Sequence, residues 1–216
     1  MPRKMKNKES KKMEIENDKK MQEKIKYFLS AKTIGNKIIY YNECDSTQKE
    51  IRKSAEKKIE NGTIVVTDYQ TNGIGTHDRI WISERGTNIT FSLVLYPKCK
   101  VKELDTITYD IARCIVETIK EISGHTLEIK KPNDIMCNGK KLGGILTQIV
   151  TTGEKIKYLL IGIGINVNQI EFPQEIGSIA TSLKKEFGQD FTREEIIAKF
   201  CNKFEEYCFD SKILLK

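Results

Sequence analysis

The chain has 216 residues, 38% of them hydrophobic and 31% charged, and a formal net charge of +7. This composition suffices for one core of ordinary size, and no run of about 18 apolar residues is present to cross a bilayer. No apolar signal core follows the basic N-terminus, and the six scattered cysteines form no Cys-x-x-Cys pair. We therefore expect a cytoplasmic protein with reduced thiols and without a structural zinc site.

The positive charge is concentrated at the N-terminus. Residues 1–27 carry ten Lys and Arg against five Asp and Glu, while the rest of the chain is close to neutral. Because this segment has little to bury, we expect a basic leader that is either disordered or helical. Contact with nucleic acid or an acidic surface is the alternative, but no aromatic residue precedes Tyr27 to stack on a base.

Hydrophobic periodicity predicts a sheet and three helices. Within 104–122, four isoleucines recur four residues apart, as on the buried face of a helix packed on a sheet. Asn138-Gly139 is a strong hairpin signal. The expected strands are 37–41, 62–68, 88–96, 127–130, 134–137, 141–150 and 157–167, and the expected helices are 49–60, 104–122 and one from a capping box at Thr192 to about residue 207.

The stretch 69–81, between two expected strands, holds Gly73, Gly75 and Arg79. Glycines let a backbone approach a ligand closely, successive backbone N–H groups can cradle an anion, and a guanidinium can complete the cage. An ordinary glycine-containing hairpin loop is the alternative. This stretch alone does not separate the two.

Three further stretches accompany this loop. Residues 45–48 are Asp-Ser-Thr-Gln at the start of an expected helix, where a hydroxyl is either a helix cap or a partner for a polar ligand. Residues 128–148 contain Lys-Lys-Pro-Asn-Asp and then Lys-Leu-Gly-Gly-Ile-Leu, and residues 161–168 are Ile-Gly-Ile-Gly-Ile-Asn-Val-Asn. In this order, the four stretches together resemble the catalytic domain of the biotin protein ligases, over residues 28–209.

The resemblance implies an α+β fold with a mixed, mostly antiparallel sheet and helices on one side, the catalytic fold shared by biotin and lipoate ligases and by class II aminoacyl-tRNA synthetases. It implies that residues 28–216 form the catalytic domain, without the DNA-binding domain or the SH3-like domain that many relatives carry. We accordingly expect no DNA partner and no membrane association, and we leave open whether the chain forms a homodimer.

The resemblance also implies a reaction. Biotin and ATP, with Mg²⁺ on the phosphates, give biotinyl-5′-AMP, which then biotinylates a specific lysine on a biotin carboxyl carrier protein, such as that of acetyl-CoA carboxylase. A lipoate-type ligase of the same fold is one alternative. A catalytically weakened remnant that still binds biotin or nucleotide is another.

The resemblance finally assigns roles to residues. Lys130 and Arg79 are expected to be catalytic, because a cation between the biotin carboxylate and the α-phosphate neutralises two anions that repel each other. Thr76 and Asp78 depart from the arginine-rich family pattern, so we expect a looser hold on the adenylate. The residues expected to bind biotin are Ser46, Thr47, Gln48, Gln70, Gly73, Ile74, Gly75, Thr76, Trp81, Lys130, Gly143 and Gly144, those expected to bind ATP are Arg79, Lys130, Asn133, Asn166 and Asn168, and none is expected to bind a metal.

Overall fold

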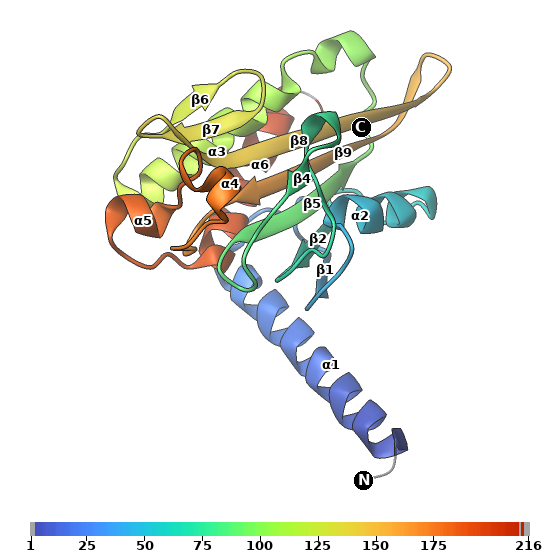
Figure 1. Ribbon diagram of the computed structural model, residues 1–216. Helices are drawn as coiled ribbons and strands as arrows, with labels where there is room; N and C mark the ends of the chain where they lie inside the picture. Colours follow the sequence, from blue (N-terminus) through green and yellow to red (C-terminus); the bar gives the residue numbers. More distant parts are fainter. Residues whose placement is uncertain (1–2, 212, 214–216) are drawn as a thin grey trace.

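A computed structural model describes residues 3–211 and residue 213, without the side chains of residues 3–15 and 78 (Figure 1). The helices are α1 (Arg3–Phe28), α2 (Thr47–Glu56), α3 (Ile107–Ser123), α4 (Gln174–Gly177), α5 (Leu183–Phe187) and α6 (Arg193–Asp210), with 3-10 turns at η1 (Thr76–Asp78) and η2 (Val101–Leu104). The strands are β1 (Ile38–Tyr41), β2 (Ile64–Thr67), β3 (Gly73–Ile74), β4 (Ile80–Trp81), β5 (Ile89–Leu95), β6 (Glu128–Lys130), β7 (Asp134–Cys137), β8 (Lys140–Thr152) and β9 (Lys155–Ile165).

Seven strands form one sheet in the order β1-β2-β5-β9-β8-β7-β6. β1 and β2 run parallel and the other neighbours antiparallel, which confirms the predicted mixed, mostly antiparallel sheet. Asn138 and Gly139 join β7 to β8 with φ of 48° and 75°, the left-handed values that a tight hairpin requires. β3 and β4 pair only with each other and form a small separate ribbon.

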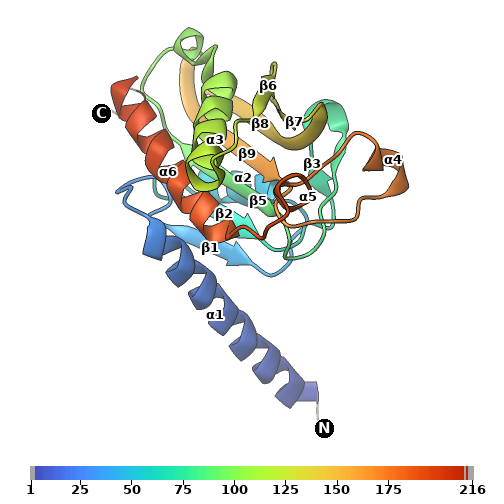
Figure 2. The ribbon, with the colours of Figure 1, turned by 90° about the vertical axis from the view of Figure 1, so that its left-hand side faces the viewer.

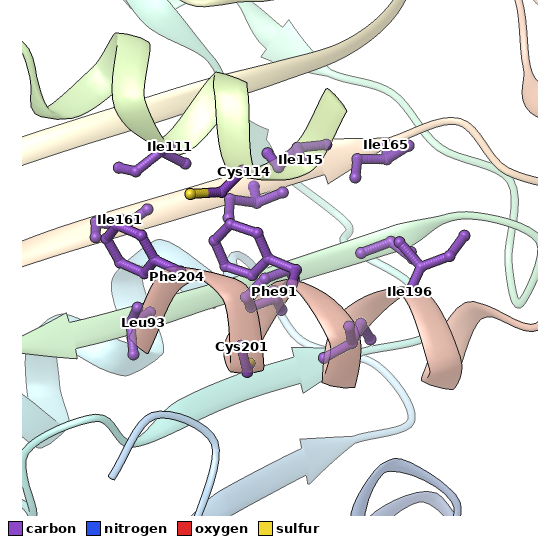
Figure 3. Close-up of a cluster of buried hydrophobic side chains, with 14 of the residues drawn as sticks. Phe91, Leu93, Ile111, Cys114, Ile115, Ile161, Ile165, Ile196, Cys201 and Phe204 are labelled. Carbon is purple, nitrogen blue, oxygen red and sulfur yellow. The ribbon is translucent and has the colours of Figure 1, made fainter. Parts of the chain in front are cut away.

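Helices cover both faces of the sheet, so the prediction of helices on one side was wrong. On one face α3 and α6 enclose the main core, to which Phe91 and Phe204 belong (Figure 3). The rings of both pack against that of Phe200. On the other face α2 packs Ile51 against Val94 and Leu160. Successive side chains of a strand point to opposite faces, so these central strands are buried on both sides and are almost continuously apolar.

The predicted leader forms a helix whose C-terminal end belongs to the core. α1 projects from the body of the molecule (Figures 1 and 2). Met21 and Ile25 near its C-terminal end are buried in the main core, and the helix contacts α6. After α1, the backbone N–H groups of residues 32, 33 and 34 all donate to the buried carboxylate of Glu205 in α6. None of the helices within the described residues is long and apolar enough to cross a membrane.

Two helix starts differ from their predicted capping. Thr192 and Ser46 occupy the N-cap positions of α6 and α2, but neither side chain makes a capping hydrogen bond within the described structure. The capping box predicted at Thr192 is therefore absent from the described residues. The buried hydroxyl of Ser46 at the start of α2 therefore does not cap its own helix and can bond another group.

Candidate active site

The site lies on the face of the sheet that carries α2, where large side chains give way to small ones. Val94 and Leu160 lie under α2, but the next cross-strand pair on this face is Ser92 with Gly162, followed by Thr90 with Gly164. β8 continues the row, since Gly144 pairs with Gly164. Glycine supplies no side chain to fill the surface, so a cavity of about 50 Å³ opens beyond the start of α2.

One end of this first cavity is a buried polar cluster. The backbone N–H and the hydroxyl of Thr47 lie 2.8 and 3.1 Å from Oε1 of Gln70. The hydroxyls of Thr47 and Ser92 lie 2.9 Å apart, and Ser92 Oγ lies 2.9 Å from Oε1 of Gln48. Ser46, Thr47, Gln48 and Gln70 are all buried and line the cavity. Buried amides and hydroxyls of this kind suit a neutral ligand that both donates and accepts hydrogen bonds.

The β3–β4 ribbon covers the cavity. A Cβ placed on Gly164 would lie 2.6 Å from Cζ2 and 2.9 Å from Nε1 of Trp81, so the indole ring rests directly on the glycine floor. Gly73 is equally confined, because a Cβ there would lie 2.7 Å from Nε2 of Gln70. The indole N–H of Trp81 is buried and has no hydrogen-bond partner among the described residues. A ligand acceptor would satisfy it.

A second cavity of about 180 Å³ adjoins the first. It lies between the ribbon and the segment after β9, and Gly75, Thr76, Trp81 and Lys141 line both cavities. Asn166 contributes a buried amide whose Nδ2 donates to the carbonyl of residue 181, while its Oδ1 has no partner among the described residues. The residues that line only the second cavity are Arg79, Ile80, Ile82, Asn166, Ile176, Ile179 and Ala180. The wall is apolar with a cation at the rim, which suits a flat ring that carries an anionic group.

Lys141 is the cation that the two cavities share. Its Nζ lies 2.6 Å from Oδ1 of Asp134, and both side chains are about one quarter to one third exposed. Lys141 is not among the predicted site residues, although it stands in the Lys-Leu-Gly-Gly-Ile-Leu stretch of the sequence. Lys130, the predicted catalytic cation, is exposed on the outermost strand β6 and lies outside the residues that line either cavity.

Most of the predicted ligand-binding residues converge here. The first cavity is lined by Ser46, Thr47, Gln48, Gln70, Ile74, Gly75, Thr76, Trp81, Asn133 and Gly144, and the second by Arg79 and Asn166. Gly143 does not line either cavity, because it pairs with Ile165 and faces the main core on the opposite side of the sheet. Asn168 also lies outside both linings, and both ends of its amide form hydrogen bonds with the backbone of Phe191. The side chain of Asp78 lies outside the described part of the chain.

A cysteine lies beside the first cavity but is not activated as a nucleophile. The backbone of Cys44 forms an isolated β-bridge with that of Gln70. Burial raises the pKa of the Cys44 thiol to about 11. At neutral pH the thiol is therefore protonated and a poor nucleophile. The chemistry that this arrangement supports is the positioning of two bound molecules around a shared cation.

The site thus combines a glycine-floored cavity that has a polar end with an adjoining apolar cavity, and the two share a lysine. Comparison with known families identifies the class: residues 41–166 match the Biotin/lipoate A/B protein ligase family, and the chain belongs to it.

Individual relatives agree. The chain is 38% identical over 184 residues to the bifunctional ligase/repressor BirA of Bacillus subtilis, covering 84% of this chain and 57% of that protein. It is 26% identical to the biotin–[acetyl-CoA-carboxylase] ligase of Mycobacterium tuberculosis, over 56% of this chain and 45% of that one. The biotin protein ligase from Aquifex aeolicus in complex with biotin and ATP superposes with a TM-score of 0.71 at 32% identity, covering 83% of this chain and 74% of that chain. The chain thus spans about half the length of these curated relatives.

Proposed function

We propose that this protein activates biotin with ATP and transfers it to a lysine of a biotin carboxyl carrier protein. Biotin occupies the first cavity and the nucleotide the second. The single observation that carries the proposal is the position of Lys141, which lines both cavities. The relatives named for biotin ligation support the same assignment.

The polar end of the first cavity favours biotin over lipoate. Biotin's ureido ring carries one carbonyl acceptor and two N–H donors, whereas the dithiolane ring of lipoate carries neither. A dithiolane would offer no hydrogen-bond partner to the buried hydroxyl of Ser46 or to the N–H groups of Gln70, and an unpaired buried polar group costs about 1–3 kcal/mol. The glycine floor then leaves room for the fused bicycle.

The ribbon must rise to admit the ligand. About 50 Å³ of free space is far below the roughly 300 Å³ of a typical small-molecule pocket. Trp81 occupies the missing volume, because its ring lies on Gly164. In our proposal the indole moves off the floor when biotin enters and then covers the bound ring.

The second cavity holds the adenosine part of the nucleotide. Its isoleucines supply an apolar wall for a base, and the orphan Oδ1 of Asn166 is an acceptor for an amino or hydroxyl group. Arg79 lies at the rim, where it can meet a phosphate. Among the described residues, His, Cys, Asp and Glu form no group of three that could hold a metal, so we propose that magnesium enters on the ATP phosphates.

Lys141 promotes the first step. The carboxylate of biotin attacks the α-phosphorus of ATP, a bond forms between them, and pyrophosphate leaves. Both reactants are anions, and a fixed ammonium between them lowers their repulsion and stabilises the charge that grows on the phosphorus oxygens. Asp134 holds the ammonium in place through the 2.6 Å contact. In the second step the carrier lysine attacks the acyl carbonyl and AMP leaves, with no covalent bond to the enzyme.

The test is biotin-dependent exchange of labelled pyrophosphate into ATP. We expect exchange with biotin and little with lipoate, and Lys141→Ala should lower the rate by about 10²–10³-fold, the usual effect of losing a group that stabilises transition-state charge. Lys130→Ala, which stands outside both cavities, is the comparison for the earlier assignment. Absence of exchange in the unaltered chain would refute the activity, and a larger loss in Lys130→Ala than in Lys141→Ala would restore Lys130 as the catalytic cation.

A further inference from the structure

The polar end of the first cavity is connected to two residues outside it. Nε2 of Gln48 lies 3.3 Å from Oε1 of Gln148 in β8, and Nη2 of Arg52 in α2 donates to that same oxygen at 2.7 Å. Arg52 and Gln148 are half-buried and line neither described cavity. The three side chains form a relay from the surface of α2 to the buried amide of Gln48.

The relay decides which way round the amide of Gln48 stands. A carboxamide can rotate by half a turn and exchange its oxygen for its nitrogen with little change in shape. Ser92 does not settle the choice, because a hydroxyl can donate or accept. A guanidinium can only donate, so Arg52 holds the oxygen of Gln148 toward itself, and that oxygen then accepts only from the nitrogen of Gln48.

We infer that Arg52 and Gln148 are positioning residues for biotin, which act by holding Oε1 of Gln48 toward the cavity as an acceptor for a ureido N–H. This inference rests on the proposed function. The oxygen lies over the glycine floor, since a Cβ on Gly162 would come within 2.9 Å of it. A rotated Gln48 would instead present N–H groups to the N–H of the ligand, and two donors repel.

The second amide of the polar cluster, that of Gln70, is fixed in the complementary sense. The backbone N–H of Thr47 can only donate, so it holds Oε1 of Gln70 toward itself and leaves the N–H groups of Gln70 for the ligand. One amide therefore donates and the other accepts, which matches a urea that has both a carbonyl and N–H groups. The backbone N–H of Thr47 fixes the orientation of the Gln70 amide, and Arg52, through Gln148, fixes that of the Gln48 amide.

The experiment is a calorimetric titration of the full chain with biotin and, separately, with ATP. We expect Arg52→Ala and Gln148→Leu to weaken biotin binding by about five- to tenfold, the equivalent of one neutral hydrogen bond, and to leave ATP binding unchanged. Gln148→Glu should bind biotin like the unaltered chain, because a carboxylate offers only acceptors and still orients Gln48. Lys53→Ala, an exposed neighbour of Arg52 paired with Glu50, is the matched control.

The double variant Arg52→Ala/Gln48→Leu distinguishes positioning from a general loss of structure. In the Gln48→Leu background, Arg52→Ala should have no further effect on biotin affinity, because no amide remains to be oriented. Wild-type affinity in Arg52→Ala, or an equal loss with and without Gln48, would overturn the inference. A loss in Gln148→Glu as large as in Gln148→Leu would also overturn it. An unaltered chain that binds no biotin would instead refute the proposed function.

Discussion

Replacing Gly164 by alanine should force Trp81 off the floor of the first cavity. The new Cβ would lie 2.6 Å from Cζ2 of the indole, where ordinary contacts begin at 3.4 Å, so the ring must retreat by about 1 Å or leave. An indole buries on the order of 150–250 Å², and exposing half of that area costs about 2–3 kcal/mol at about 25 cal/mol/Å². The clash with the new Cβ drives the movement against this cost, and since β3 and β4 pair only with each other, no ladder hydrogen bond to the main sheet opposes it.

The chain offers a direct readout, because Trp81 is its single tryptophan. In Gly164→Ala we expect the emission maximum to shift to the red and acrylamide to quench it more strongly, with little change in far-ultraviolet circular dichroism. Gly144→Ala is the matched control, since it pairs with Gly164 on β8 but a Cβ there would meet Trp81 at an ordinary 3.5 Å. If both variants gave the emission of the unaltered chain, the indole would not rest on Gly164 and the account of the closed cavity would be wrong.

Three further changes have expected outcomes. Adding biotin should change the emission of Trp81 in a saturable way, because the ring must move for the ligand to enter; a flat titration in a chain that binds biotin by calorimetry would contradict this. Glu205→Ala should lower the free energy of unfolding by about 2–4 kcal/mol in chemical denaturation, since it leaves three backbone donors without their carboxylate, whereas exposed Glu206→Ala should change it little. Burial raises the pKa of the Cys114 thiol to about 12, so above pH 9 the unfolded chain loses this proton before the folded chain does. The free energy of unfolding should therefore fall between pH 9 and 12, by up to about 1.4 kcal/mol per pH unit. Cys114→Ala should show a shallower fall, and a slope equal to that of the unaltered chain would count against this account.

The strands were predictable because burial dictates their composition. The stretches expected at 88–96 and 157–167 correspond to β5 and β9, which are buried on both faces and so are almost unbroken runs of apolar residues. The hairpin at Asn138-Gly139 was predictable for a local reason, the need for positive φ at two successive residues. The position of α2 was not, because its apolar residues show that it packs but not on which face of the sheet.

The site was predictable in its members more than in their roles. Gly143 and Gly144 could have been separated from the sequence, because neighbours in a strand face opposite sides and only one of the two can reach the ligand. The choice between Lys130 and Lys141 could not. It depends on which strand lies at the edge of the sheet, and on the irregular register between Ile135 and Met136, where β7 pairs with β8. The position of the Asn168 side chain likewise depends on its hydrogen bonds with Phe191, which lies 23 residues away in the sequence.

The two cavities are not independent, and this constrains how the ligands bind. Gly75, Thr76 and Trp81 belong to the ribbon and line both cavities, so a ribbon that rises for one ligand removes part of the wall that meets the other. When the ribbon then closes over a ligand ring in one cavity, its residues again form part of the wall of the other cavity. We therefore expect binding in one cavity to change the affinity of the other, and by thermodynamic linkage the effect should be equal in both directions. The shared wall thus couples occupancy of the two cavities, while the shared lysine couples their charges.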